Sequence, residues 1–287
     1  MTLSRSDVHQ LLGDHGLHPS RALGQNFVVD PNTVRRIARL AGVTDGSAVV
    51  EIGAGLGSLT LALAETGARV VAVEIDRGIV PVLRQVVAGH GVTVVEGDAL
   101  ELDWEDLLGP ADPARPWALV ANLPYNVATP LVIRVLEEAP QVLGLLVMVQ
   151  REVGERWAAS PGESAYGAVS VKIAYWGHAR VVGRVPPTVF VPRPKVDSAL
   201  VRIERRPRPA VDPAVVPYDR LCEVVGAGFS QRRKMLRRSL AGVLDPNAFA
   251  AADVSPEARA EDLSVEQWGN LASWGLRAGG GKDRPSA

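Results

Sequence analysis

AVVEIGAGLGSLTLALAET (48–66) joins two sequence patterns of different period through a run of glycines. The stretch begins as a short apolar run rich in β-formers and ends with apolar residues at helical spacing. Gly53, Gly55 and Gly57 lie between the two patterns, where glycine allows a sharp turn and lets a ligand touch the backbone. This order predicts a strand, a ligand-binding turn and a helix.

The same alternation continues on both sides of this stretch. Strands are expected at 48–52, 69–76, 92–98, 117–122, 143–150 and 195–204. Helices are expected at about 58–66, 79–87 and 130–138, and from Pro31, with Asp30 as its N-cap, to a stop at Gly42. Strands that alternate with helices predict an α/β fold of parallel βαβ units, with helices on both faces of the sheet.

Polar residues and glycine stand where four of these strands end. Gly53, Glu74, Asp98 and Asn122 each end or follow a predicted strand. Parallel sheets bind ligands outside the carboxyl ends of their strands. The four residues are therefore expected to line one pocket.

The composition limits the classes of protein that fit. With 287 residues, 47% of them apolar, the chain can form one large domain and a smaller one. The single cysteine, Cys222, excludes an intramolecular disulfide and a cysteine-based zinc site, which favours the reducing cytoplasm. The apolar run at 143–149 is too short to span a bilayer, so no membrane partner is expected.

The first thirty residues are expected to be loop-like and free of a signal peptide. Three histidines in this region are His9, His15 and His18. They have no cysteine or carboxylate at ligand spacing, so no metal site is expected.

The net charge of −1 conceals a basic block. Between Arg202 and Arg238, ten Arg and Lys residues stand against four Asp and Glu, so this segment carries +6 and the remainder −7. Such a block favours a phosphate-rich partner, although a solvated helix face is the alternative interpretation.

Two carboxylates suggest the kind of ligand. Glu74 is placed to accept hydrogen bonds from ribose hydroxyls, and Asp98 to accept one from an adenine amine. The alternative is that both are caps at the start of loops. Both would repel a pyrophosphate, which disfavours a nicotinamide dinucleotide, whereas S-adenosylmethionine has no phosphate and carries a sulfonium cation. The series E-x-G-x-G-x-G with an acid after the second strand is similar to the motif of class I methyltransferases.

NLPYN (122–126) suggests the chemistry. The Asn122 side-chain carbonyl and the Leu123 backbone carbonyl can accept hydrogen bonds from an adenine amine and aim its lone pair at a methyl group. Tyr125 offers a face on which a flipped base can stack, and Phe190 is a second candidate for its other face. A β-turn with a half-buried tyrosine, and a core position for Phe190, are the alternatives.

Several motifs together resemble those of the ribosomal RNA adenine dimethyltransferases, in particular the bacterial small-subunit branch. The motifs are ALGQNFVVD (22–30), EIGAGLGSLT (51–60), VEID (73–76), EGDAL (96–100), NLPYNVATPL (122–131), FVPRPKVDSAL (190–200) and FSQRRKMLRRSL (229–240). The resemblance implies a Rossmann-like class I methyltransferase domain with a small C-terminal helical domain. It implies four methyl transfers from S-adenosylmethionine to the exocyclic amines of two adjacent adenines near the 3′ end of 16S rRNA, late in assembly of the small subunit.

The same resemblance assigns roles to residues. It implies that the cofactor is bound by Asn26, Val28, Gly53, Gly55, Glu74, Asp98 and Asn122. It also implies that the target adenine is held by Asn122, Leu123, Tyr125 and Phe190. Val28 stands where the family usually has leucine, which a cofactor lid should tolerate.

The expected organisation has four parts. Residues 1–45 form an N-terminal arm and cofactor-covering helix, 46–206 the methyltransferase domain, 207–275 a helical RNA-binding domain and 276–287 a disordered tail. In FSQRRKMLRRSL we expect one helix, with Phe229, Met235, Leu236 and Leu240 facing inward. Its RNA-binding surface would be Arg232, Arg233, Lys234, Arg237 and Arg238, which should read RNA through its phosphates and shape. The expected partners are small-subunit rRNA and the immature 30S subunit, and the protein is expected to be a monomer.

Three rival functions remain open from the sequence. One is a macrolide-resistance methyltransferase of large-subunit rRNA, which uses the same catalytic residues. The second is a non-catalytic rRNA-binding assembly factor, against which the intact pocket residues argue. The third is a nicotinamide-dependent oxidoreductase.

Overall fold

The computed structural model describes residues 2–112, 114–124 and 126–276, and the chain divides into two compact units. Unit 1 consists of Met1–Glu155 and His178–Arg205, and unit 2 of Arg156–Gly177 and Arg206–Ala287. The sequence placed all of 46–206 in one domain, whereas the structure assigns residues 156–177 to unit 2. The physical reason is burial, because Tyr166, Val171 and Tyr175 pack in the core of unit 2.

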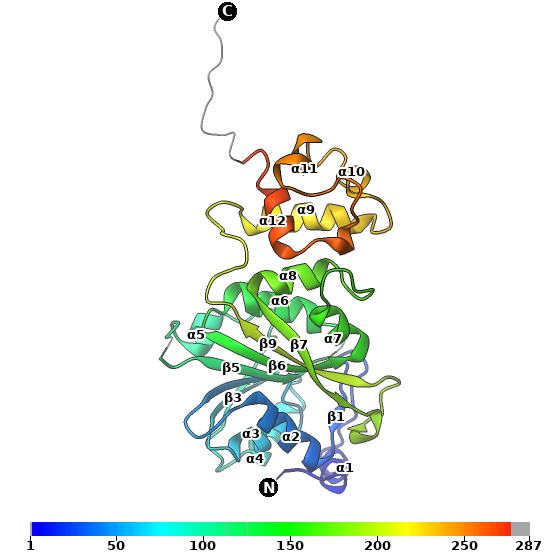
Figure 1. The fold of residues 1–287 in the computed structure, drawn as a ribbon. Helices are drawn as coiled ribbons and strands as arrows, with labels where there is room; N and C mark the ends of the chain where they lie inside the picture. Colours follow the sequence, from blue (N-terminus) through cyan, green and yellow to red (C-terminus); the bar gives the residue numbers. More distant parts are fainter. Residues whose placement is uncertain (1, 113, 125, 277–287) are drawn as a thin grey trace, which may run out of the picture. The chain divides into compact units, whose positions relative to one another are not determined.

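Unit 1 contains a seven-stranded sheet with the order β4-β3-β2-β5-β6-β9-β7 (Figure 1). Its strands are β2 (Ala48–Ile52), β3 (Arg69–Glu74), β4 (Thr93–Glu96), β5 (Trp117–Asn122), β6 (Val142–Gln150), β7 (Gly177–Val185) and β9 (Ser198–Arg205). The first five strands in this order are parallel, and β9 pairs antiparallel with β6. The predicted α/β fold is confirmed, with an antiparallel edge that the sequence analysis did not predict.

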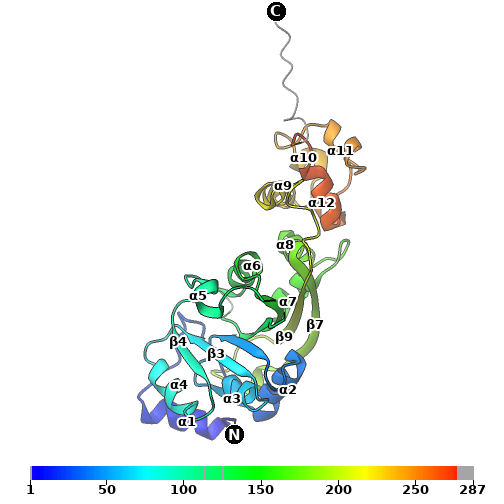
Figure 2. The ribbon, with the colours of Figure 1, turned by 90° about the vertical axis from the view of Figure 1, so that its left-hand side faces the viewer.

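Helices cover both faces of this sheet (Figure 2). One face carries α2 (Pro31–Ala41), α3 (Ser58–Ala64) and α4 (Val80–Val86), and the other carries α5 (Trp104–Leu108) and α6 (Ala128–Glu138). All five residues of β2 are buried, as expected for a central parallel strand covered on both sides. The helix α2 begins and ends as predicted, because the Asp30 side chain accepts a hydrogen bond from Thr33 and Gly42 adopts a left-handed conformation.

The first thirty residues are not all loop, which corrects the sequence analysis. Helix α1 (Arg5–Asp14) starts with a capping box, in which Ser4 and Asp7 satisfy each other's backbone N–H groups. Its buried residues Val8 and Leu12 pack in one apolar cluster with Phe27. The polar run around Ser4 was interpreted as a loop although it is a helix start.

A second, two-stranded sheet ties the N-terminal segment to a distant part of unit 1. Strand β1 (Phe27–Val28) pairs antiparallel with β8 (Phe190–Val191), which follows the short 3-10 helix η1 (Pro187–Val189). In this register Val28 lies opposite Phe190. The pairing holds residues 27–28 of the N-terminal segment beside residues 190–191.

Unit 2 is a helical unit with its own apolar core. Its elements are α8 (Ala168–Trp176), α9 (Tyr218–Ser230), α10 (Leu236–Ser239), α11 (Asn247–Ala251), η2 (Ala260–Asp262) and α12 (Val265–Ala272), and α7 (Arg151–Ala158) runs into it from unit 1. Trp268 is fully buried, and a Cβ on Gly228 of α9 would lie 2.3 Å from its ring. Glycine at 228 therefore lets α9 and α12 approach closely.

Residues 277–287 of the predicted tail lie outside the described residues. Within the described ranges, no helix is both long and apolar enough to cross a membrane.

Candidate functional site

The residues predicted at strand ends lie along one edge of the sheet. Glu74 is the last residue of β3 and Asn122 is the last residue of β5. Gly53 directly follows β2, and Asp98 comes two residues after β4. Since β2 lies between β3 and β5 in a parallel sheet, these carboxyl ends are neighbours, as predicted.

Two adjoining pockets open at this edge, which corrects the expectation of one pocket, because Glu74 and Asn122 line the first and Asp98 lines the second. The first, which we call the glutamate pocket, is lined by residues that include Asn26, Val28, Glu51, Gly55, Glu74 and Asn122. The second, the aspartate pocket, is lined by residues that include Ala22, Ile52, Val73, Asp98, Leu100 and Asn126. Leu23, Gly53, Ile75, Leu123 and Pro124 line both pockets. None of the described residues that line either pocket is Lys or Arg.

Glu74 holds the glycine turn in place. Its Oε2 accepts a hydrogen bond of 2.7 Å from the Gly55 N–H, and its Oε1 accepts one of 2.9 Å from the Asp76 N–H. Glu74 is only 5% exposed, and burial raises the pKa of its carboxyl, although these backbone N–H groups oppose the shift. A carboxylate accepts about four hydrogen bonds, so Glu74 retains acceptor capacity for a ligand.

Glu51 is a second buried carboxyl on the glutamate pocket. It is 1% exposed, and its Oε2 has no hydrogen-bond partner among the described residues. Burial raises the pKa of Glu51 to about 8, and the nearby charge of Glu74 adds to this shift. At neutral pH the ligand-free fold therefore keeps a proton on Glu51, and a cationic ligand in this pocket would favour its release.

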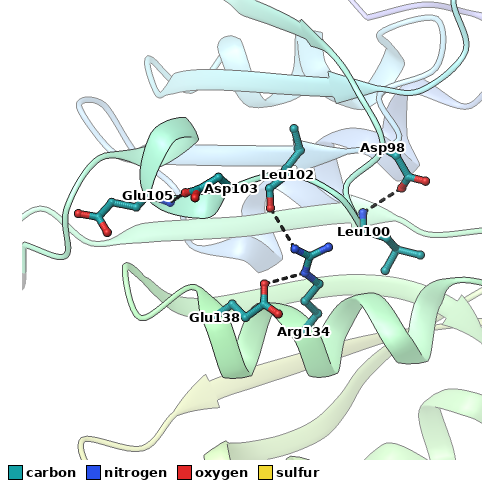
Figure 3. Close-up of polar contacts among 7 residues, drawn as sticks. All are labelled: Asp98, Leu100, Leu102, Asp103, Glu105, Arg134 and Glu138. Atoms are coloured by element: carbon teal, nitrogen blue, oxygen red, sulfur yellow. Dashed lines mark hydrogen bonds and ion pairs between the residues drawn. The ribbon is translucent and has the colours of Figure 1, made fainter.

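Asp98 is held on a turn at the aspartate pocket (Figure 3). Its Oδ1 accepts a hydrogen bond of 2.9 Å from the Leu100 N–H, which leaves the other carboxylate oxygen for further acceptance. Downstream, the Leu102 carbonyl accepts a hydrogen bond of 3.3 Å from Arg134 of α6. Arg134 is itself held by Glu138 at 2.7 Å, so α6 fixes the turn that carries Asp98.

The segment before β1 forms one wall of both pockets. A Cβ on Gly55 would lie 3.0 Å from the Phe27 ring, and Gly55 adopts a positive φ of +57°. A Cβ on Gly24 would likewise lie 3.0 Å from Pro124. Glycine at these two positions lets residues 22–28 pack against both the glycine turn and Pro124.

Asn122 is oriented by this same segment. Its Nδ2 donates a hydrogen bond of 3.0 Å to the Asn26 backbone carbonyl. That bond fixes which way the amide points and leaves Oδ1 as an acceptor. Leu123 continues the strand edge, with its N–H bonded to the Met148 carbonyl at 3.1 Å.

Two predicted adenine contacts have different outcomes. Tyr125 lies outside the described residues. Phe190 is only 2% exposed and packs in the apolar cluster that contains Val28 and Val34. It is not among the residues that line either pocket, so its contact with a base stays a prediction.

The expected basic helix at 229–240 is not one helix, which corrects the sequence analysis. Helix α9 ends at Ser230, and α10 covers only Leu236–Ser239. Leu236 and Leu240 are buried as expected, but Met235 is 41% exposed because the chain turns between the two helices.

The five basic side chains of this segment differ in their partners. Arg232 pairs with Glu261 at 2.6 Å and also donates to the Ser164 carbonyl, while Arg237 pairs with Glu257 at 3.4 Å. The other three, Arg233, Lys234 and Arg238, are exposed. These three side chains can therefore contact RNA without breaking an ion pair between described residues.

Sequence reasoning missed several pocket residues. Leu23 and Ile75 line both pockets, and Ile75 is 43% exposed although it follows a buried strand. The sequence offers one signal for Ile75, because this apolar residue directly follows Glu74 in VEID. Glu51 lies within strand β2, so the strand pattern alone does not mark it as a pocket residue.

The chain is similar to known ribosomal RNA methyltransferases. The family described as ribosomal RNA adenine dimethylase matches residues 18–275. A Kineococcus radiotolerans protein named Ribosomal RNA small subunit methyltransferase A is 46% identical over 291 residues, covering 97% of this chain and 94% of that protein. A Mycobacterium tuberculosis protein of the same name is 43% identical over 299 residues, covering 99% and 90%. The solved structure of the 23S rRNA methyltransferase ErmE is similar, with a TM-score of 0.66 at 28% identity, covering 86% of this chain and 98% of that chain.

Proposed function

The chain belongs to the ribosomal RNA adenine dimethylase family, and we propose that it dimethylates the exocyclic amines of two adjacent adenines near the 3′ end of small-subunit (16S) rRNA. It is an rRNA adenine dimethyltransferase with a Rossmann-like methyltransferase fold, and S-adenosylmethionine is the methyl donor. The proposal concerns the substrate, the site residues and the link to late assembly of the subunit.

The observation that carries the proposal is the arrangement of Glu74, Asp98 and Asn122 around two adjoining pockets. Glu74 lines one pocket and Asp98 lines the other. This arrangement suits an adenosine whose ribose hydroxyls donate to Glu74 and whose adenine amine donates to Asp98. The exposed Ile75 between the pockets offers an apolar contact for the base.

The pocket chemistry also suits the charge of the cofactor. Bound S-adenosylmethionine supplies an electrophilic methyl group on a sulfonium centre. Glu51 and Glu74 give the glutamate pocket two buried carboxyls, and no described residue lining it is cationic. A pyrophosphate would find no compensating cation among these lining residues, which disfavours a nicotinamide dinucleotide.

The residues of the chain then prepare the adenine amine. Asn122 Oδ1 accepts a hydrogen bond from the amine, and the Leu123 backbone carbonyl accepts a second. Together they orient the nitrogen lone pair and draw the amine towards a tetrahedral shape. No general base is required before methylation, because the proton becomes acidic once the nitrogen is alkylated and passes to water. Tyr125 and Phe190 are proposed to contact the faces of the flipped base.

The choice of ribosomal subunit rests on the relatives. The two proteins at 43% and 46% identity, aligned over nearly their whole length, carry a small-subunit name. The similar structure of a large-subunit enzyme is only 28% identical. The small-subunit substrate is therefore favoured over the macrolide-resistance type.

Contact with rRNA is assigned to the basic segment of unit 2. Arg233, Lys234 and Arg238 would contact phosphates first, with Arg232 and Arg237 beside them. The enzyme is proposed to act in the cytoplasm, as a monomer, on the immature 30S subunit.

The test is methyl transfer from labelled S-adenosylmethionine to 30S and 50S subunits isolated from a strain lacking this activity. The proposal predicts label in the 30S subunit alone, in two adjacent adenines. Label in 23S rRNA would establish the large-subunit alternative instead.

A further inference from the structure

Gln25 makes a two-ended contact that the proposed chemistry does not use. Its side-chain Nε2 donates a hydrogen bond of 2.7 Å to Asp76 Oδ2, across 51 positions of sequence. Its side-chain Oε1 accepts one of 2.7 Å from the Ser20 N–H. The Gln25 backbone N–H returns to the Ser20 carbonyl at 3.1 Å, so a closed turn presents the amide to Asp76.

Asp76 connects this amide to the cofactor pocket. Its Oδ1 accepts from the Gly78 N–H at 2.9 Å, which fixes the carboxylate. Its own N–H donates to Glu74 Oε1 at 2.9 Å. Gln25 therefore bonds to a loop whose backbone holds the buried Glu74 carboxylate.

The residue after Gln25 leads to the reacting centre. The Asn26 backbone carbonyl is the acceptor for Asn122 Nδ2 at 3.0 Å. Residues 20–26 thus span from the end of β3 to the end of β5, bonded to Asp76 at one side and to Asn122 at the other. A shift of this segment would move the carbonyl that orients the Asn122 amide.

We propose that the hydrogen bond between Gln25 and Asp76 is a latch that makes Gln25 a positioning residue for Asn122, an inference that rests on the proposed function. The latch holds residues 20–26 against both pockets and keeps Asn122 Oδ1 free to accept from the adenine amine. Gln25 itself acts through the Asn26 carbonyl.

The donor and acceptor pattern explains why an amide faces an acid here. Gln25 must accept from the Ser20 N–H and donate to Asp76, and a carboxylate at position 25 can only accept. Gln25→Glu would place two carboxylates within hydrogen-bond distance. Asp76→Asn would place two amide donors there, or lose the Gly78 contact if the side chain turned over.

Exchanging the amide and the carboxylate between positions 25 and 76 restores every hydrogen bond. With Gln25→Glu and Asp76→Asn combined, the new carboxylate accepts from the Ser20 N–H and from the new amide, which still accepts from Gly78. The geometry therefore predicts that two damaging substitutions rescue each other. A residue needed only for general packing would not show this reciprocal pattern.

The experiment compares Gln25→Glu, Asp76→Asn, their combination and Gln25→Ala in the full chain. Calorimetry gives the Kd for S-adenosylmethionine, single-turnover methyl transfer to unmethylated 30S subunits gives the rate, and thermal unfolding reports the fold. Each single variant is expected to lose on the order of 10-fold or more in rate, with weaker cofactor binding. The combined variant should return to within about 3-fold of wild type.

Gln10→Glu is the matched control, because Gln10 donates to Asp14 at 3.4 Å on an exposed face of α1. It makes the same chemical change in the same N-terminal region and should leave rate and Kd unchanged. Gln25→Ala removes the contact without adding repulsion, so a variant that folds poorly does not decide the result alone.

The proposed role of the latch is contradicted if Gln25→Ala matches wild type in both rate and Kd. It is also contradicted if the combined variant stays as impaired as the single variants. Failure of the proposed function is distinct, because wild-type protein would then leave 30S subunits unmethylated. The calorimetric comparison of the variants would still decide the latch.

Discussion

Asn122 and Asn26, 96 residues apart, are joined by a 3.0 Å hydrogen bond in which Asn122 Nδ2 donates to the Asn26 backbone carbonyl. The bond sets the orientation of the amide before a substrate arrives. Because the N–H side of the amide is engaged, its oxygen is the atom left to meet an incoming amine. The N-terminal segment therefore helps to position Asn122 for the proposed chemistry.

Replacing Asn122 should abolish turnover and spare binding. Asn122→Ala removes the acceptor for the adenine amine and is expected to lower the rate of methyl transfer about 100- to 1000-fold. Asn122→Asp should be similarly impaired, since it places an acceptor against the Asn26 carbonyl. Single-turnover assays measure the rate, and sedimentation with 30S subunits measures binding.

The control for this pair is Asn32→Ala, an exposed asparagine at the start of α2. It should behave as wild type in both assays. Methylation by Asn122→Ala at the wild-type rate would remove Asn122 from the mechanism.

Glu51 should make stability depend on pH. Burial raises its pKa from 4.5 to about 8 in the folded protein, so the folded state keeps a proton that the unfolded state has released. The contribution of Glu51 to stability is therefore complete below about pH 4.5 and is lost as pH rises towards 8. Glutamine at position 51 cannot ionise. As the pH rises from 5 to 8.5, the free energy of unfolding of Glu51→Gln should therefore fall by roughly 2–4 kcal/mol less than that of wild type.

Urea unfolding of ligand-free protein at several pH values measures this effect. Glu105→Gln, at an exposed position of α5, is the matched control and should keep the wild-type dependence. A constant difference between Glu51→Gln and wild type at every pH would show that Glu51 does not hold a proton in the fold.

Arg205 should be important for the stability of unit 1. Its guanidinium donates to four backbone carbonyls at or just beyond the end of α6, with distances of 2.8 to 3.1 Å, and the acceptors are Val135, Leu136, Ala139 and Val142. Lysine cannot reproduce this planar fork, so Arg205→Lys leaves carbonyls unsatisfied. We expect a loss of about 2–3 kcal/mol in the free energy of unfolding.

Arg180→Lys is the comparison, because Arg180 makes an exposed pair with Glu204 at 3.0 Å. Its expected effect is below about 0.5 kcal/mol. Equal effects of the two substitutions in denaturant unfolding would contradict the capping role of Arg205.

The basic residues of unit 2 should separate into two groups. Replacing Arg233, Lys234 and Arg238 together by alanine should weaken 30S binding and lower the slope of log K against log salt by about 2, with the fold unchanged. Arg232→Ala should instead lower thermal stability, because it breaks the contacts with Glu261 and the Ser164 carbonyl. Filter binding at several salt concentrations, with thermal unfolding, measures both. An unchanged salt slope in the triple variant would place the RNA contact elsewhere.

Much of the fold was predictable because periodicity and strand ends are local properties. The run 48–52, the glycines after it, and Glu74 and Asn122 at their strand ends are all where the sequence indicated. Parallel sheets bring such ends to one edge, so the site followed from the order of the strands.

Other features depend on contacts between distant segments and were missed. Residues 156–177 belong to unit 2 because their aromatic side chains pack there, which no local pattern reveals. The arginine-rich segment looked helical, yet the chain turns after Ser230 so that Arg232 can reach Glu261. The sequence predicts no role for Gln25 within ALGQNFVVD, because its partner Asp76 lies 51 positions away.

The most direct test of the central claim is the state of the two adjacent adenines near the 3′ end of 16S rRNA in a strain from which this gene has been deleted. Primer extension across that region stops at dimethylated adenines. We expect no stop in the deletion strain, a restored stop with the wild-type gene and none with Asn122→Ala. Adenines that remain dimethylated in the deletion strain would contradict it.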